Sequence, residues 1–391
     1  MGNVPNLRFP EFSGEWSSQP LTDFMNFKNG LNPDAKRFGR GTKFISVMDI
    51  LNNQYICYDN IRASVELQDG DIETYGVDYG DILFQRSSET LEDVGRANVY
   101  LDSKPAIFGG FVIRGKSKGN YNPLFFRYLL ASPTVRKRII VKGAGAQHFN
   151  IGQDGLSKVS LDIPRLSEQE KIGKLLQCVD ARIATQNKII EDLKKLKSAI
   201  IHRCYSSQTN MIPLSELLKQ CSDRNRSGSD LQVLSVSNKY GFIAQSDQFE
   251  DREVASDDTS NYKVVKKGMF AYNPARINVG SIALYEMDGN GIVSPMYVCF
   301  TTKSELLPSY LKYYFASQTF KHEMYKRLEG SVRLCLTFEE LCNIEIHLPS
   351  IEQQKNISKY ISKIENNLSL VDSIFSKYQQ QRRYLLSQMF I

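Results

Sequence analysis

The sequence lacks the segments that would place it in a membrane or outside the cell. None of its apolar runs approaches the 18 or so residues that a membrane-spanning helix needs. The N-terminal stretch MGNVPNLRFPEFSGEW has neither the basic start nor the apolar core of a signal peptide, so we expect a cytoplasmic protein. With 391 residues, of which 41% are hydrophobic and 24% charged, the chain can fill two or three globular domains, and wholesale disorder is excluded.

Metal-binding and disulfide patterns are also missing. The seven cysteines are an odd number, none of them stands in a C-x-x-C motif, and only four histidines could assist them. A structural zinc site needs four clustered ligands, which paired short spacings usually announce. We therefore expect no metal site and no disulfide framework, and we interpret the thiols as small packed apolar groups.

The chain contains an internal repeat. The segment FFRYLLAS at residues 125–132 is echoed by YLKYYFAS at residues 310–317, which is an offset of 185 residues. The offset continues without a gap, so that Pro164 aligns with Pro349 and Gln169 with Gln354. A period of this length is too long for a solenoid, and it predicts a duplicated unit of one domain followed by one helix.

Each repeat ends in a segment that reads as one long helix. Residues 167–206 contain no proline and one glycine, and residues 351–391 contain neither. Apolar residues alternate at spacings of four and three, which is typical of a coiled-coil seam. The expected seam positions are Ile172, Leu176, Val179, Ile183, Ile190 and Leu193 in the first helix and Ile357, Ile361, Ile364, Leu368, Val371 and Phe375 in the second. Lys197 and Arg382 also fall in the seam, where we expect each to snorkel or to pair with a partner's carboxylate.

Start signals precede both helices. Ser167 and Glu170 fit an S-x-x-E capping box after Pro164, and Pro349 precedes the second helix. At 1.5 Å per residue each helix would be roughly 55–60 Å long, which predicts a rigid spacer.

The remaining sequence reads as mixed α/β. Strands are expected at 43–50, 81–85, 108–114 and 159–163, and in the second repeat at 232–236, 269–272, 292–301 and 343–348. A helix is expected near 123–138 and near 308–326. The predicted fold class is therefore α/β (α+β), with two tandem mixed domains at residues 1–166 and 207–350 and spacer helices at 167–206 and 351–391.

Two motifs suggest enzymes, but their contexts argue against this. Gly110–Ser117 matches the G-x-x-x-x-G-K-[ST] pattern of a phosphate loop, yet Phe111, Val112 and Ile113 favour a strand, and a turn follows Ser117 instead of a helix. Tyr272–Gly280 has the start of an adenine methyltransferase signature, but Ala275 and Arg276 replace the second proline and the aromatic residue. We expect no catalytic residues.

Polar loops paired between the repeats are the candidates for a binding surface. Arginine, asparagine and glutamine have the geometry for bidentate contacts with base edges, and the net charge of +6 is compatible with a nucleic-acid partner. The candidate DNA-contacting residues are Arg86, Ser87, Gln147, His148 and Asn150 in the first repeat and Asn238, Tyr240, Asn273, Arg276, Asn278 and Arg333 in the second.

Several of these segments together resemble a known family. The opening PNLRFPEFSGEW, the turn GDILFQR at 80–86, the junction PRLSEQEKI at 164–172 and its repeat PSIEQQKNI at 349–357 are similar to the DNA-specificity subunits of type I restriction-modification systems. The resemblance covers the whole chain. The second repeat departs from the first by carrying Tyr-Asn-Pro-Ala-Arg at 272–276.

The resemblance implies a non-catalytic reader of DNA. Two target-recognition domains would each bind half of a split, asymmetric sequence in double-stranded DNA, with the long helices antiparallel between them in a pseudo-two-fold, circular organisation. Two methylation subunits would dock on this chain, and motor-nuclease restriction subunits would join them. S-adenosylmethionine, ATP and Mg would belong to those partners and none to this chain. The alternatives are a coiled-coil scaffold with two ligand-binding domains and no nucleic-acid partner, and an ATP-dependent enzyme built on Gly110–Ser117.

Overall fold

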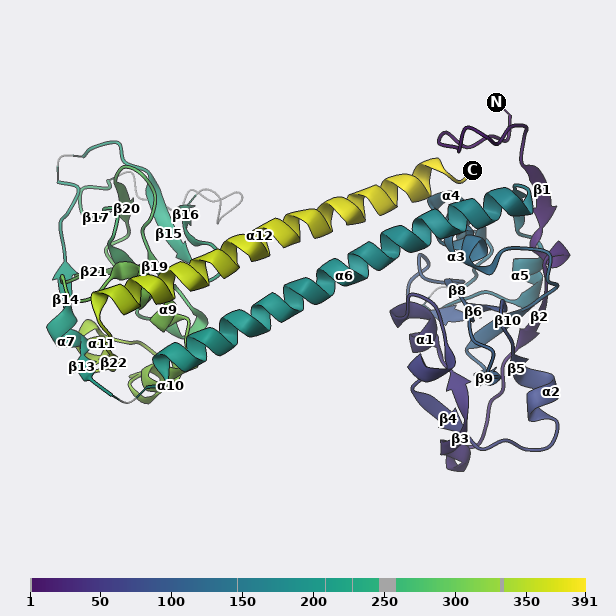
Figure 1. Ribbon diagram of the computed structural model, residues 1–391, viewed down its shortest axis with the longest axis horizontal. Helices are drawn as coiled ribbons and strands as arrows, with labels where there is room; N and C mark the ends of the chain where they lie inside the picture. Colours follow the sequence, from purple (N-terminus) through teal and green to yellow (C-terminus); the bar gives the residue numbers. More distant parts are fainter. Residues whose placement is uncertain (1, 146, 208, 227, 246–257, 331–333) are drawn as a thin grey trace. The chain divides into compact units, whose positions relative to one another are not determined.

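The computed structural model describes residues 2–145, 147–207, 209–226, 228–245, 258–330 and 334–391 (Figure 1). The chain forms two compact units, here called unit 1 (Met1–Asn187 with Ser373–Ile391) and unit 2 (Lys188–Asp372). The boundary between them falls within two long helices, α6 (Leu166–Tyr205) and α12 (Ile351–Gln388). Unit 1 therefore holds the start of α6 and the end of α12, whereas unit 2 holds the end of α6 and the start of α12.

Unit 1 contains two four-stranded sheets and two short strand pairs. The first sheet is antiparallel, in the order β2 (Met25–Asn29), β10 (Val112–Ser117), β6 (Ile82–Gln85) and β8 (Ala97–Val99). The second has the order β4 (Ala63–Val65), β3 (Phe38–Ile45), β9 (Ala106–Phe108) and β5 (Gly76–Val77), with β3 and β9 parallel. The two pairs are β1 (Ser17–Pro20) with β12 (Ser160–Ile163) and β7 (Ser87–Ser88) with β11 (Phe149–Asn150).

Short helices complete unit 1. They are α1 (Val47–Asn52), α2 (Asp71–Tyr75), α3 (Pro123–Ala131), α4 (Pro133–Ile140) and α5 (Gln153–Ser157), together with the 3-10 turns η1 (Leu21–Asp23), η2 (Ala35–Arg37) and η3 (Tyr58–Asn60). Pro123 begins α3 because a proline at the first helical position loses no hydrogen bond, and the Asn122 side chain caps it by accepting from the Phe125 N–H.

Unit 2 repeats the strand orders of unit 1. One sheet runs β14 (Leu218–Cys221), β21 (Val298–Thr302), β18 (Phe270–Tyr272) and β19 (Ile282–Leu284), and the other runs β16 (Gly241–Ala244), β15 (Val233–Ser237), β20 (Gly291–Val293) and β17 (Lys263–Val265). β13 (Met211–Pro213) pairs with β22 (Glu345–His347). The helices are α7 (Leu214–Leu217), α9 (Pro308–Phe315), α10 (Gln318–Lys326), α11 (Phe338–Cys342) and the 3-10 turn η4 (Ile277–Val279). The duplicated, mixed α/β organisation predicted from the sequence is confirmed.

The cores extend from the sheets onto the long helices. In unit 1, Ile172, Leu176 and Val179 of α6 pack in one cluster with Phe125 and with Met389, near the end of α12. In unit 2, Ile361 of α12 packs with Ile201 and Tyr205 of α6 and with Tyr310 of α9. Each globular domain therefore shares its core with halves of both long helices.

Two segments that were each expected to form one helix are divided into two helices. The helix expected at 123–138 is broken at Ser132, which has an extended backbone and caps α4 ahead of Pro133. The helix expected at 308–326 is broken in the same way at Ser317, which caps α10.

Several predicted boundaries are wrong for local reasons. The strand expected at 43–50 ends at Ile45, because Ser46 and Asp49 form a capping box that starts α1. The strands expected at 108–114 and 292–301 are each interrupted by a turn, at 110–111 and at 294–297. α6 begins at Leu166, so Ser167 lies inside the helix and is not its cap. At α12, Ser350 and Gln353 make the reciprocal capping contacts.

None of the described helices is both long enough and apolar enough to cross a membrane.

Candidate nucleic-acid interface

In unit 1, the end of β6 brings several predicted residues together. The half-buried Arg86 donates from Nη1 to the Gly110 carbonyl at 3.3 Å, and its own carbonyl accepts from the Ile151 N–H. Ser87 Oγ donates to Asn150 Oδ1 at 2.5 Å, across the β7–β11 pair. Gln147 and His148 are exposed in the loop that precedes β11. We call this the strand-end surface of unit 1.

Two further residues of this surface were not among the predicted ones. Phe111 is 69% exposed, and its carbonyl accepts from the Arg86 N–H at 2.9 Å. An exposed aromatic ring can stack on a nucleic-acid base. Gln85 is buried, and its Nε2 donates to the Ser87 carbonyl at 2.9 Å, which shapes the turn that carries Arg86. The turn was not predicted because Phe111–Ile113 are strand-forming residues. The burial of Gln85 depends on the fold and has no signal in the sequence.

The corresponding loop of unit 2 follows β18. Asn273 is buried, with Oδ1 accepting from the Ala275 N–H at 3.0 Å, so its side chain supports the turn. Arg276 is exposed, and its carbonyl accepts from the Val279 N–H at the start of η4. Asn278 is half-buried, and its carbonyl accepts from Tyr325 Oη at 3.5 Å. The structure therefore presents Arg276 outward and Asn273 inward.

A hairpin turn lies next to this loop. Asn238 and Tyr240 are exposed in the turn between β15 and β16, and Lys239 Nζ lies 4.9 Å from the centre of the Tyr240 ring. Gly280 has a φ of +93°, and a Cβ on it would lie 3.5 Å from Asn238 Cβ, so the two loops are neighbours. The candidate residue Arg333 lies outside the described residues.

We call the loop after β18, together with the neighbouring turn at 238–240, the strand-end surface of unit 2, and strand pairing shows that the two surfaces are equivalent. Phe84 pairs with Ile113 in unit 1 and Tyr272 with Val298 in unit 2, so that Gln85 and Asn273 both stand one residue beyond the pair. The repeat offset matches Phe111 to Met296, which is 61% exposed. Each surface thus consists of a buried amide at a strand end, an arginine within three residues of it, and a large exposed apolar side chain.

The phosphate-loop interpretation fails on geometry. Gly110 and Phe111 form a turn, and the rest of the motif is strand β10, so that no helix begins at Lys116. Lys116 Nζ lies 3.5 Å from Asp81 Oδ2, and the Ser117 N–H donates to Asp81 Oδ1 at 2.8 Å. Burial raises the pKa of the Asp81 carboxyl above its ordinary value. Lys116 and Ser117 therefore have structural partners, which is inconsistent with a phosphate loop.

The expected seam residues differ in burial along the helices. Ile172, Leu176, Val179, Ile190 and Ile361 are buried, whereas Ile183, Leu193, Ile357, Ile364, Leu368, Val371 and Phe375 are half-buried. Within unit 1, Arg382 Nε donates to Asp180 Oδ1 at 2.6 Å, and within unit 2, Lys197 Nζ donates to Glu365 Oε1 at 2.6 Å. The two charged seam residues therefore pair with carboxylates of the other long helix.

The junction motifs hold the helix starts in place. Glu168 is buried and accepts two hydrogen bonds from the Arg8 guanidinium, both at 2.8 Å. This pairing raises the pKa of Arg8. Trp16 Nε1 also donates to Glu168, at 3.4 Å. The opening segment of the chain is thus fixed to α6.

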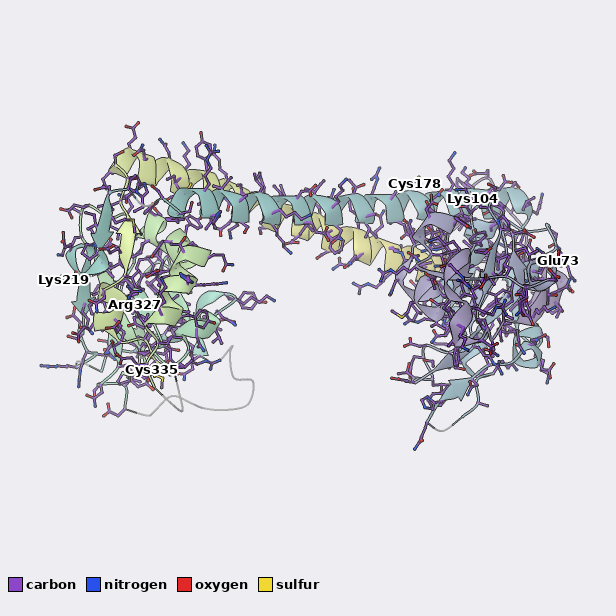
Figure 2. All side chains as sticks on the ribbon, turned by 90° about the horizontal axis from the view of Figure 1, so that it is seen from below. Glu73, Lys104, Cys178, Lys219, Arg327 and Cys335 are labelled. Atoms are coloured by element: carbon purple, nitrogen blue, oxygen red, sulfur yellow. The ribbon has the colours of Figure 1, made fainter. Side chains whose placement is uncertain are left out.

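Within the described part of the chain, no group of three or more histidine, cysteine, aspartate or glutamate side chains could hold a metal ion. The seven cysteines are all free, and Cys178 is exposed on α6 (Figure 2).

Comparisons with known proteins match nearly the whole chain. A family model described as the type I restriction modification DNA specificity domain matches residues 13–195 and 227–374. The chain is 24% identical to the type I restriction enzyme MjaVIII specificity subunit of Methanocaldococcus jannaschii, over 93% of this chain and 88% of that protein.

Two solved structures share the fold. The crystal structure of a type I restriction-modification system S subunit from M. genitalium matches with a TM-score of 0.61 and 14% identity, covering 99% of both chains. A chain from a structure concerned with complex assembly and conformational transition of the type I R-M system matches with a TM-score of 0.54 and 13% identity, over 95% of this chain and 96% of that one.

Proposed function

The chain belongs to the type I restriction modification DNA specificity domain family, and we propose that its two units each read one half of a split, asymmetric sequence in double-stranded DNA. As a specificity subunit it recognises DNA and is not itself catalytic. The observation that supports two separate reading heads is the pair of equivalent strand-end surfaces, which share a backbone arrangement but differ in side chains. Two units with the same backbone arrangement but different side chains are suited to recognise two half-sites of different sequence.

The proposal assigns different roles to the residues of each surface. Arg86 and Arg276 are candidates for base-edge contacts, and Phe111, Tyr240 and Met296 are exposed apolar side chains that would lie against bases or sugars. Ser87, Asn150, Gln147, His148, Asn238 and Asn278 are further polar candidates. Gln85 and Asn273 are both buried, so their side chains would stabilise the loops from the protein interior and would not contact DNA.

We also propose that this chain assembles with other subunits in the cytoplasm. Two methylation subunits would dock on this chain, and restriction subunits would join the complex, so S-adenosylmethionine, ATP and Mg would be bound by those partners. A duplicated chain suits two identical partners, since each unit offers one copy of the same fold. Cellular DNA as the target implies the cytoplasm.

Replacing one arginine at a time tests the proposed reading heads. Arg86→Ala should relax one half-site and Arg276→Ala the other, each by about 1–3 kcal/mol if the arginine contacts a base. The measurement is sequencing of methylated positions in DNA treated with the full chain and its methylation subunits. Arg165→Ala, which removes an exposed arginine outside both surfaces, is the control. Equal weakening at all sequences in both variants would refute base contact.

A simpler binding measurement distinguishes a DNA-binding protein from a coiled-coil scaffold without a nucleic-acid partner. Filter binding to mixed-sequence duplex DNA, with and without the methylation subunits, should show retention of DNA by the complex. Absence of retention under both conditions would favour a scaffold without a nucleic-acid partner.

A further inference from the structure

Each unit contains a carboxylate that joins three helices. In unit 1, Asp180 of α6 accepts from Tyr128 Oη of α3 at 2.9 Å and from Arg382 Nε of α12 at 2.6 Å. In unit 2, Glu365 of α12 accepts from Tyr313 Oη of α9 at 2.8 Å and from Lys197 Nζ of α6 at 2.6 Å. We call these arrangements the acid junctions.

The repeat offset of 185 residues relates the two junctions member by member. It matches Asp180 to Glu365, Tyr128 to Tyr313, and Lys197 to Arg382. The carboxylate and the cation differ in type between the units, yet the contact between three helices is the same. One member has no counterpart, because Arg127 Nη1 donates to Asp180 at 3.1 Å in unit 1, whereas the matching Lys312 pairs with Glu286 in unit 2.

The junctions supply directional contacts where apolar packing is incomplete. The Asp180 side chain is only 8% exposed, and both of its carboxylate oxygens accept hydrogen bonds. An open cavity of about 620 Å³ lies beside it, lined by Ile183 and Phe375 among others. A similar cavity of about 710 Å³ lies beside Lys197 and Leu368 in unit 2. Charge-assisted hydrogen bonds fix an angle, whereas apolar contacts alone permit tilting into such space.

A short path connects each junction to a strand-end surface. In unit 1, α3 packs on β8, and Ala97 of β8 pairs with Phe84 of β6, the strand that leads to Arg86. In unit 2, α9 packs on β19, and Ile282 of β19 pairs with Tyr272, just before the loop that carries Arg276. A tilt of α3 or α9 would therefore move the reading loop of the same unit.

We infer that the acid junctions hold each globular domain at a fixed angle on its helix pair. They thereby restrict recognition to DNA in which the gap between the half-sites has one particular length. The inference rests on the proposed function. Asp180, Tyr128 and Arg382 in unit 1, and Glu365, Tyr313 and Lys197 in unit 2, act through the orientation of the domain without touching DNA.

The test measures separately which bases are recognised in each half-site and which gap length between the half-sites is preferred. Full chain and methylation subunits are presented with duplexes that carry the wild-type half-sites and a gap of native length, one base pair shorter or one base pair longer. Asp180→Asn should leave the recognised bases unchanged. It should reduce the preference for the native gap length by about tenfold or more, the equivalent of about 1.4 kcal/mol. Glu365→Gln should have a smaller effect, because the Glu365 side chain is 33% exposed.

Asp192→Asn is the matched control, since Asp192 is an exposed carboxylate on α6. Preference for the native gap should be unchanged in this variant. If Asp180→Asn lowers the melting temperature but leaves gap preference at the wild-type value, the junction is only structural and the inference is overturned. An equal loss of gap preference in Asp192→Asn would overturn it as well.

A charge exchange covers the case in which Asp180→Asn does not fold. Glu365→Lys alone should lose gap preference, and adding Lys197→Glu should restore it, because the pair is re-formed with its charges reversed. Failure of the second change to restore the preference would overturn the inference. Absence of any split target for the wild-type complex would instead refute the proposed function, and it would be seen before any variant is compared.

Discussion

At the scale of single residues, two buried glutamines connect the long helices to the globular domains. Gln169 Oε1 accepts from the Asn122 N–H and its Nε2 donates to the Pro164 carbonyl, both at 2.9 Å. Gln354 makes the equivalent contacts with the Leu307 N–H at 2.8 Å and the Pro349 carbonyl at 2.9 Å. The glutamine in each junction motif therefore ties the start of a long helix to the start of α3 or α9.

Removing one of these amides should destabilise its unit. Gln169→Leu leaves the Asn122 N–H and the Pro164 carbonyl without partners, which should lower the free energy of unfolding by about 2–4 kcal/mol. Urea unfolding followed by the fluorescence of Trp16, the single tryptophan, reports on unit 1 directly. The exposed Gln381→Leu on α12 should change stability by less than about 0.5 kcal/mol. Equal midpoints for the two variants would contradict the assigned role.

Cysteine reactivity should follow burial. Burial raises the pKa of the Cys299 thiol to about 12, so this thiol stays protonated near pH 8 and reacts slowly, because the thiolate is the nucleophile. Cys178 is exposed (Figure 2) and should be alkylated by iodoacetamide within the first minutes. Mass spectrometry of timed samples should show Cys299 modified only after urea is added. Modification of both thiols at one rate in the folded protein would be inconsistent with the buried site.

At the scale of elements, the long helices combine two kinds of packing. Leu176 is fully buried in the core of unit 1, whereas Ile183, two turns further along α6, is half-buried and packs against the edge of that core. The seam is thus part of a globular core near the helix start and a thinner contact beyond it.

Substitution to alanine should reveal this gradient. Leu176→Ala should cost about 2–5 kcal/mol, as large-to-small changes in a closed core do, and Ile183→Ala should cost less than half as much because a half-buried site leaves less cavity. Both residues belong to unit 1, so Trp16 fluorescence during urea unfolding measures both. A cost for Ile183→Ala equal to or above that for Leu176→Ala would show that the seam is uniformly packed.

The elements also show which features sequence reasoning can reach. The long helices and their seam were predictable because a spacing of four and three repeats along both helices, and the duplication was predictable from the constant offset. The turn at 110–111 was not predictable, because Phe111–Ile113 favour a strand locally. The partner of Lys197 could not be predicted either, since Glu365 lies 168 residues away and only the register between the helices brings it close.

The candidate site shows the same division. Arg86 and Arg276 were predicted from the type of side chain in paired loops, and each lies in the loop that follows a strand, β6 or β18. Asn273 was predicted on the same grounds, but it is buried and its amide supports the turn. Which side of a loop faces the protein depends on the strands beneath it, and a single sequence does not contain that information.

At the scale of the whole chain, the two ends meet in one unit. The Leu7 N–H donates to the Gln388 carbonyl at 2.9 Å, and the rings of Trp16 and Phe390 lie 6.5 Å apart, so residues from both ends complete the core of unit 1. Unit 2 is formed from the continuous stretch between them. The circular organisation predicted from the sequence follows from these contacts.

A domain exchange tests whether the two units of this chain recognise their half-sites independently. Residues 15–166 would be replaced by the corresponding domain of another specificity subunit, and methylated positions would be sequenced after expression with the methylation subunits. We expect one half-site to change, while the other half-site and the gap stay as in the wild type. A change in both half-sites, or in neither, would show that the two units do not recognise DNA independently.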